Sequence, residues 1–350
     1  MKLILCDLFP PSNSKATTTS SNQVSHDEDV EQFLTLELIP RFREQIRNKK
    51  IPFSMNFELK HVIGTGVLGR NTHELNHPKD VVVSYNHSCI LIADFNNHRV
   101  LVHDLMTYRF KKSIPLSFPA KMCIESNYKG GLNDALIIAQ FHHEYFVCKY
   151  DLSMLLNNQR TQSNYDLKYL WKSETYFYNP EKSMTISRAK KQVFIADNKD
   201  QKRSRCYCVK ILCLETGERV QTIYLHGSPY GMTFIEDYGF LVVGTHLNNK
   251  IQMFKYDGID SWNKINSFGK SGKDEGELCY PSSLIYEQAS QHIIECNYSN
   301  ARIQVFKLDG SFVKSFGSRE LSIEGRHFDL IQSFLPNQRW LINYYRYQQH

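Results

Sequence analysis

After residue 50 the chain alternates short apolar runs with polar turns, and this alternation repeats along the sequence. The clearest unit begins at Pro281 and contains four apolar runs, over residues 282–286, 292–297, 301–308 and 312–317. Asp309 and Gly310 separate the last two runs, and an Asp-Gly pair between apolar runs is typical of a tight hairpin. The pattern therefore predicts four short antiparallel strands in each unit.

The same frame recurs at intervals of roughly 40 to 60 residues, a period typical of repeat architectures. Each copy opens with a proline that precedes its first apolar run, at Pro78, Pro119, Pro180, Pro229 and Pro281. A sixth, incomplete copy follows over residues 328–331 and 340–344. Repeated four-stranded units of this length indicate the blades of a β-propeller. We therefore predict an all-β, six-bladed propeller.

Residues 57–64 suggest how the ring closes. They precede the first unit, yet they match residues 312–317, the fourth apolar run of the Pro281 unit. We expect them to form the fourth strand of the last blade and so to join the start of the ring to its end. The third strand of that blade has two candidates, residues 345–349 and residues 2–8. If residues 2–8 supply it, residues 10–56 are a long insertion in one hairpin.

The chain before the repeats has a different composition. Residues 10–26 are rich in Ser, Thr, Pro and Asn, as flexible segments are. Residues 27–39 place acidic side chains before apolar ones, which predicts a short helix that ends at Pro40, and a second helix is expected over residues 41–49. We divide the 350-residue chain into a flexible, partly helical segment, 1–50, and a propeller, 51–350.

Residues 92–104 carry a recognisable motif. Asp94 is followed by Asn97, His98 and Arg99 and then by an alternating strand, and this order resembles the NHL repeat. The resemblance extends over residues 57–350, and implies an NHL-type propeller like the recognition domain of tripartite-motif ubiquitin ligases. Residues 142–144 and 198–206, in the second and third units, lack the Asn-His-Arg core.

We interpret this motif as architecture rather than as a site, because a catalytic group is needed once whereas these residues recur around the ring. Asp and Asn side chains commonly cap the exposed backbone groups of loops. The residues assigned to the structural motif are Asp94, Asn97, His98, Arg99, Asn300 and Arg302.

Composition and cysteine content argue against a membrane protein, a secreted protein and a metal-binding protein. The chain is 41% hydrophobic, which is ample for a folded core, and it has no run of 18 apolar residues that could cross a membrane. Residues 1–7 make a poor secretory signal, and the nine cysteines are scattered without a Cys-x-x-Cys pair. Residues 142–144, His-His-Glu, have no evident third ligand nearby. We expect a cytoplasmic protein without metal or cofactor, and no membrane partner.

The net charge of +6 is concentrated in one segment. Residues 182–210 hold nine basic and two acidic side chains, whereas residues 1–50 are balanced. A propeller divides this segment between its two faces, and the larger part shares a face with other polar side chains. The candidate binding face comprises Arg70, His73, Asn97, His98, Lys199, Lys202, Arg203, Arg205, Tyr230, Lys270 and Lys273.

No phosphate-binding loop, nucleophile elbow or zinc-protease motif occurs, so we expect no enzymatic activity. The resemblance implies a protein-binding scaffold, in the context of a ubiquitin ligase that binds elsewhere, because the chain lacks the paired Cys and His residues of a RING or B-box. One alternative is RNA binding through the basic and aromatic face. A second is a lyase or lactonase with a metal in the central channel. We expect a monomer with a protein partner.

Overall fold

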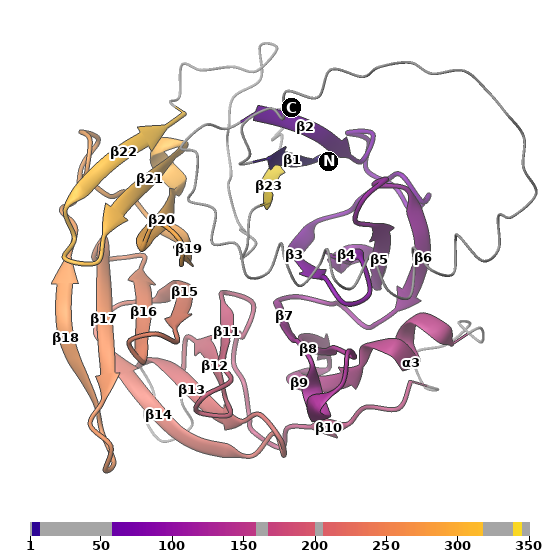
Figure 1. Cartoon of the computed structure of the whole chain (residues 1–350), viewed down its shortest axis with the longest axis horizontal. Coiled ribbons are helices and arrows are strands. Elements are labelled where there is room, and N and C mark those ends of the chain that lie inside the picture. Colours follow the sequence, from indigo (N-terminus) through magenta and orange to yellow (C-terminus); the bar gives the residue numbers. More distant parts are fainter. Residues whose placement is uncertain (1, 8–57, 159–166, 200–205, 318–338, 345–350) are drawn as a thin grey trace, which may run out of the picture.

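The structure is a computed structural model that describes residues 2–7, 58–158, 167–199, 206–317 and 339–344. The described strands form six sheets arranged in a ring (Figure 1). The described ranges also contain four short helices: α3 (Leu152–Asn157) and the 3-10 helices η2 (Phe95–Asn97), η3 (Tyr128–Gly130) and η5 (Tyr298–Asn300). In the described ranges no helix combines the length and hydropathy that a membrane span requires.

Five of the sheets are four-stranded antiparallel blades, each built from consecutive strands. The first blade contains β3 (Pro78–Ser84), β4 (Cys89–Asp94), β5 (Arg99–Asp104) and β6 (Phe110–Pro115). The second contains β7 (Met122–Glu125), β8 (Ala135–His142), β9 (Glu144–Asp151) and β10 (Trp171–Lys172). The third contains β11 (Met184–Ser187), β12 (Gln192–Asp197), β13 (Tyr207–Cys213) and β14 (Arg219–Leu225).

The fourth blade contains β15 (Pro229–Ile235), β16 (Phe240–Thr245), β17 (Lys250–Tyr256) and β18 (Trp262–Phe268). The fifth contains β19 (Pro281–Glu287), β20 (His292–Asn297), β21 (Arg302–Lys307) and β22 (Phe312–Phe316). The first strand of each blade lies nearest the centre of the ring and the fourth lies at its rim (Figure 1). The fold is therefore an all-β propeller.

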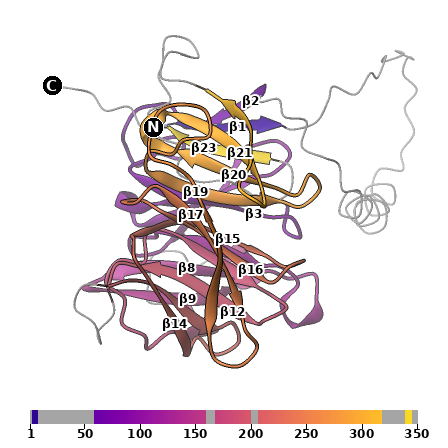
Figure 2. The ribbon, with the colours of Figure 1, turned by 90° about the vertical axis from the view of Figure 1, so that its left-hand side faces the viewer.

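The prediction of six blades is wrong, because the propeller has five. The sector between the fifth blade and the first holds a three-stranded sheet in the order β2 (Glu58–Ile63), β1 (Lys2–Asp7) and β23 (Arg339–Tyr344) (Figures 1 and 2). β1 is antiparallel to both neighbours, with Ile4 opposite Val62 and Ile342. This sheet is assembled from distant parts of the chain, and residues 2–7, from one of the two segments considered for this place, lie between residues 58–63 and 339–344.

Several predictions for the ends of the chain lie outside the described residues. They are the flexible segment and helices over residues 10–49, the first strand of the last unit over residues 328–331, and the alternative strand over residues 345–349.

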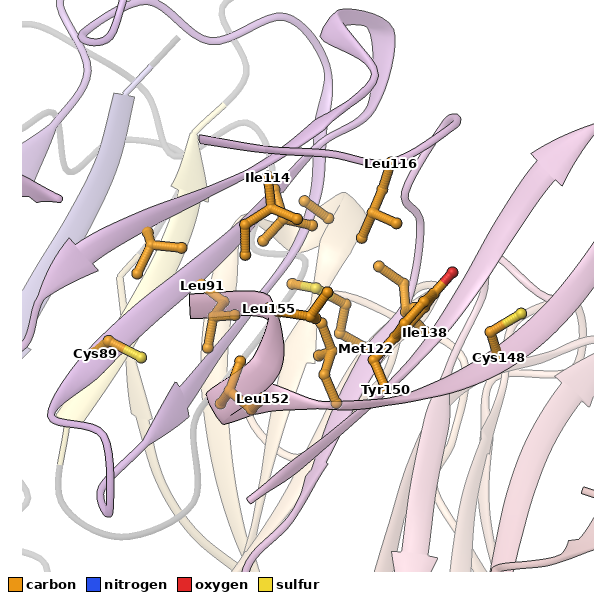
Figure 3. Close-up of a cluster of buried hydrophobic side chains, with 14 residues drawn as sticks. Cys89, Leu91, Ile114, Leu116, Met122, Ile138, Cys148, Tyr150, Leu152 and Leu155 are labelled. Carbon is orange, nitrogen blue, oxygen red and sulfur yellow. The ribbon is translucent and has the colours of Figure 1, made fainter. Parts of the chain in front are cut away.

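Apolar side chains fill the spaces between neighbouring blades. The cluster between the first two blades includes Leu91, Ile114, Met122, Ile138 and Leu155, which come from four strands and from α3 (Figure 3). Neighbouring blades cover both faces of the inner strands of a blade. For this reason β4 is buried at every position, and its residues do not alternate between core and solvent. Burial of apolar area between blades is therefore the main stabilising contribution to the ring.

Helix α3 is attached to the first blade through its C-terminal end. Lys112 on β6 donates hydrogen bonds from Nζ to the main-chain oxygens of Leu155 and Leu156 at 3.2 and 3.0 Å. A cation at the C-terminus of a helix also meets the negative end of its dipole. Lys112 thus fixes α3 over the apolar cluster between the first two blades.

Gly231 marks the closest backbone approach between the fourth and fifth blades. A Cβ atom there would lie 2.8 Å from the main-chain nitrogen of Leu284 and from the carbonyl carbon of Ser283. Both obstructing atoms belong to the backbone of β19, so neither can move aside by rotation of a side chain. Only glycine lets these strands pack at this distance.

We expect Gly231→Ala to lower the free energy of unfolding by about 1–3 kcal/mol or more, the usual cost of overpacking. Chemical denaturation monitored by tryptophan fluorescence measures this change. Gly131→Ala is the control, because its Cβ would meet only one atom within 4 Å, the main-chain nitrogen of Asn133 at 3.8 Å. Equal stability of the two variants would contradict the assignment of a tight interface.

Candidate functional site

The two sides of the ring are built from different connections. Antiparallel strands alternate in direction, so the loops between second and third strands open on the same side as the segments that join successive blades. We call this side the joint face, and the opposite side the turn face. In the first blade a hydrogen bond of 2.7 Å from the main-chain nitrogen of Asn76 to Asp94 Oδ1 ties a joint to a loop.

The polar side chains of the motif around Arg99 form hydrogen bonds within the joint face. Arg99 Nε donates to Asp94 Oδ2 at 2.8 Å, and Asn97 Nδ2 donates to the same oxygen at 2.8 Å. Asp94 and Asn97 are buried. The guanidinium of Arg99 also donates to three main-chain oxygens of the preceding joint, those of Arg70, Asn71 and Glu74. These donors are directed into the protein.

The fifth blade repeats this arrangement. Asn300 Nδ2 donates to the main-chain oxygen of Gly272 at 2.9 Å, and Arg302 donates to main-chain oxygens of its joint, those of Lys273, Asp274 and Glu277. Asn297 takes the position of Asp94 and donates to the Glu277 oxygen at 2.7 Å. In both blades the motif residues bind the backbone of the joint.

In the third blade a lysine takes the place of the arginine that binds the joint. Asp197 occupies the position of Asp94 at the end of its strand, but its partner on β13 is Cys208 instead of an arginine. Lys210, two residues further along β13, places Nζ 2.6 Å from Asp197 Oδ2 and 2.7 Å from the main-chain oxygen of Tyr176. Both side chains of this ion pair are fully buried. Lys210 therefore replaces the missing arginine of the repeat.

The structure separates the predicted basic residues into distinct groups. Lys270 Nζ forms an ion pair of 2.6 Å with Glu277 Oε1. The centroid of the His98 ring lies 3.8 Å from that of the Phe118 ring. Burial, aided by the charge of Arg70, lowers the pKa of His98. Arg70, His73, Lys199 and Lys273 are exposed, whereas Lys202, Arg203 and Arg205 lie outside the described residues.

Tyr230 lies in an aromatic cluster of the fourth and fifth blades. The centroid of the His246 ring is 4.0 Å from that of Tyr230 and 4.3 Å from that of Tyr280. Lys182 Nζ donates to the Tyr230 hydroxyl at 2.7 Å and lies 4.3 Å above its ring. We call Lys182, Tyr230, His246 and Tyr280 the tyrosine cluster. Sequence reasoning did not assign Lys182 or His246 to the site, although His246 follows β16 where Phe95 follows β4.

A second group of side chains links the first three blades on the same face. Lys79 on β3 forms an ion pair of 3.1 Å with Glu181, and Tyr145 on β9 donates to the other oxygen of that carboxylate at 2.6 Å. Burial and the neighbouring carboxylate raise the pKa of the Tyr145 phenol. The charge of Glu181 is therefore balanced within the ring.

Apolar and aromatic side chains near the tyrosine cluster face solvent. Tyr178, Leu247 and Tyr280 are exposed to 43%, 61% and 39%. Tyr178 precedes the third blade, Leu247 lies in the loop after β16, and Tyr280 precedes β19, so all three lie on the joint face. This part of the face presents a surface suited to contact rather than to core packing.

Metal ligands do not gather in the part of the chain that the structure describes. Within these ranges there is no group of three or more His, Cys, Asp or Glu side chains placed to hold a metal. The tilted rings of His142 and His143, 4.4 Å apart, lie at the turn between β8 and β9. The channel-metal enzyme remains a prediction from the sequence.

Comparisons with known proteins support the fold and one stretch of the resemblance. No family model matches the chain. Over 58 residues the chain is 40% identical to protein lin-41 of Caenorhabditis elegans, an NHL-repeat protein, and this stretch covers 17% of the chain and 5% of lin-41. The crystal structure of a functionally unknown protein from Desulfotomaculum acetoxidans DSM 771 has a TM-score of 0.51 and 15% identity, over 79% of this chain and 78% of that one. This last similarity concerns the fold alone.

Proposed function

We propose that this propeller is a non-enzymatic scaffold that binds a partner protein through the joint face of its third to fifth blades. The observation that carries the proposal is the exposure of Tyr178, Leu247 and Tyr280 around the tyrosine cluster. Aromatic side chains are enriched in protein interfaces because a rigid ring buries a large area at a small cost in conformational entropy. The propeller and the short lin-41 match are compatible with this role.

RNA binding receives less support from the described side chains. The guanidinium groups of Arg99 and Arg302 donate hydrogen bonds to main-chain oxygens, and Lys270 is paired with Glu277. Binding of a nucleic acid depends on cations that remain available to neutralise phosphates. The exposed tyrosines alone suit either ligand, so nuclease treatment forms part of the test.

The resemblance to tripartite-motif proteins extends the proposal to a cellular context. In this extension the bound protein is a client that the propeller presents to a ubiquitin ligase attached elsewhere. The contact surface for this client is the one that contains Tyr178, Leu247 and Tyr280.

The proposal is tested by affinity purification of the full chain from cells, with and without nuclease. The joint-face variant is Tyr178→Ser/Leu247→Ser/Tyr280→Asn, in which asparagine tolerates the positive φ of residue 280. The control is Met106→Ser/Ile259→Ser, which removes two apolar side chains that are 68% and 87% exposed in turns of the turn face. We expect the wild type and the control to retain the same stable partners, and the joint-face variant to lose them.

Nuclease should leave this recovery unchanged. Partners that disappear on nuclease treatment would support RNA as the primary ligand instead. Equal recovery by all three proteins, at matched melting temperatures, would show that the joint face is not the contact surface.

A further inference from the structure

We infer that the tyrosine cluster is a carboxylate-binding site centred on Lys182, and that the segment bound there is an acidic peptide with an apolar or aromatic residue next to its acid. The inference rests on the proposed function and specifies the chemistry of the partner. On the joint face, Lys182 and Lys199 lie more than 4.0 Å from every carboxylate of the described residues.

Lys182 is a cation whose neighbouring carboxylate is already used. Glu181, the preceding residue, accepts from Lys79 and from Tyr145 on its two oxygens. Among the described residues, no carboxylate lies within 4.0 Å of Lys182 Nζ, whose hydrogen-bond partner is the Tyr230 hydroxyl. An ammonium group has three donors, so two remain for a ligand.

The Tyr230 hydroxyl supplies a further donor at the same point. It accepts the hydrogen bond from Lys182, so its own proton is available for another acceptor. A carboxylate oxygen placed beside this pair would accept from the ammonium and from the phenol. Charge-assisted hydrogen bonds of this kind are stronger than those between neutral groups.

The His246 ring borders the site and carries no charge at neutral pH. Its ring packs between Tyr230 and Tyr280, and burial together with the charge of Lys182 lowers its pKa to about 4. Tyr280 and Leu247 lie exposed beside it. The cation is therefore bordered by apolar and aromatic surface, which suits an acidic residue with an apolar neighbour.

A second unbalanced cation lies in the adjacent loop. Lys199 Nζ lies 4.2 Å above the exposed ring of Tyr178, and it too lacks a carboxylate within 4.0 Å among the described side chains. Asn198 accepts a hydrogen bond of 2.9 Å from Ser228, which connects this loop to the joint before β15. The face thus repeats the combination of an ammonium and a tyrosine, as a peptide with two separated acids would require.

The pattern favours a peptide over RNA. The nearby cations Lys79 and Lys210 are already neutralised by Glu181 and Asp197, so a continuous phosphate backbone would meet only separated ammonium groups. Isolated acidic side chains on a peptide match two separated cations, and the flanking residues can use the apolar surface.

The test is a selection of random dodecapeptides displayed on phage against the immobilised full chain. We expect enrichment of Asp or Glu next to an aromatic or aliphatic residue. An enriched sequence is then synthesised with a fluorescein label, together with a counterpart in which Asn or Gln replaces each acid, and both are titrated by fluorescence polarisation. We expect the neutral peptide, and the Lys182→Met variant with the acidic one, to bind about 10- to 100-fold more weakly.

Lys191→Met is the matched control, because Lys191 is an exposed lysine in the turn between β11 and β12, on the turn face. It should leave the affinity unchanged. Enriched peptides without acids, or equal affinity for Lys182→Met, would overturn the carboxylate site, and the proposed function would survive if Tyr280→Asn still weakened binding. No enriched peptide, or displacement by an oligouridine that binds more tightly, would overturn the proposed function as well.

Discussion

Replacing Lys210 with methionine should lower the free energy of unfolding by about 3–5 kcal/mol, the usual cost of removing one partner of a buried ion pair. Lys210 and Asp197 are both fully buried and lie 2.6 Å apart. The variant leaves the Asp197 carboxylate without its cation and the Tyr176 carbonyl without its donor. Guanidinium unfolding at pH 7, followed by fluorescence and circular dichroism, measures the loss.

Two controls separate this effect from a general sensitivity to lysine removal. Lys191→Met breaks a pair with Glu215 in which the two side chains are 68% and 61% exposed, and it should leave the free energy of unfolding nearly unchanged because water and salt screen exposed charges. The double variant Lys210→Met/Asp197→Asn removes the stranded charge and should recover part of the loss. A Lys210→Met protein as stable as the Lys191→Met protein would refute the structural role of the pair.

Glu295→Gln should make the propeller more stable above neutral pH and leave it unchanged in acid. Glu295 is fully buried on β20, and neither carboxyl oxygen has a hydrogen-bond partner among the described residues. Burial raises its pKa well above 4.5, although Gln304 and Arg302 oppose this shift. The folded state therefore holds a proton that the unfolded state releases, so stability is full below pH 4.5 and falls as pH rises towards the folded-state pKa.

The wild type should lose up to about 1.4 kcal/mol per pH unit through this group over that range, and the glutamine variant should not. Urea unfolding at several pH values between 4 and 9 gives both curves. Glu144→Gln, at the exposed first residue of β9, is the control and should follow the wild type. Parallel curves for Glu295→Gln and the wild type would mean that residue 295 does not titrate in this window.

The strands of the propeller were predictable because their signals are local. Pro78, Pro229 and Pro281 begin β3, β15 and β19, and the apolar runs after them became first and second strands. The Asp309-Gly310 pair lies between β21 and β22, as expected of a hairpin. Each of these features depends on a few neighbouring residues, so a single sequence contains it.

The number of blades was not predictable in the same way. The sheet between the fifth and first blades pairs β1 with β23, and the sequence offered residues 2–8 only as one of two candidates for this place. The repeat count treated residues 340–344 as part of a sixth unit. The structure places β23 beside β1 and β1 beside β2, and among the described residues this sheet has three strands where each blade has four.

The site showed the limit of counting charges along the chain. Lys210 was counted in the basic segment 182–210, but it is buried against Asp197 and contributes nothing to a surface patch. Lys182 was counted in the same way, and only the structure shows that the carboxylate of the preceding residue, Glu181, is paired with Lys79. Whether a lysine is paired depends on side chains that neighbouring strands or other blades bring beside it, and the sequence alone does not identify them.

The pairing of β1 with β23 also fixes the order of events during synthesis. β1 leaves the ribosome about 330 residues before its partner, so this sheet can be completed only after synthesis has passed residue 344. The blades in between can form while synthesis continues, since each is made of consecutive strands. A chain that stops before residue 339 would leave one edge of β1 unpaired, and such an edge is a template for aggregation. Ring closure therefore distinguishes chains that contain β23 from chains that stop before it.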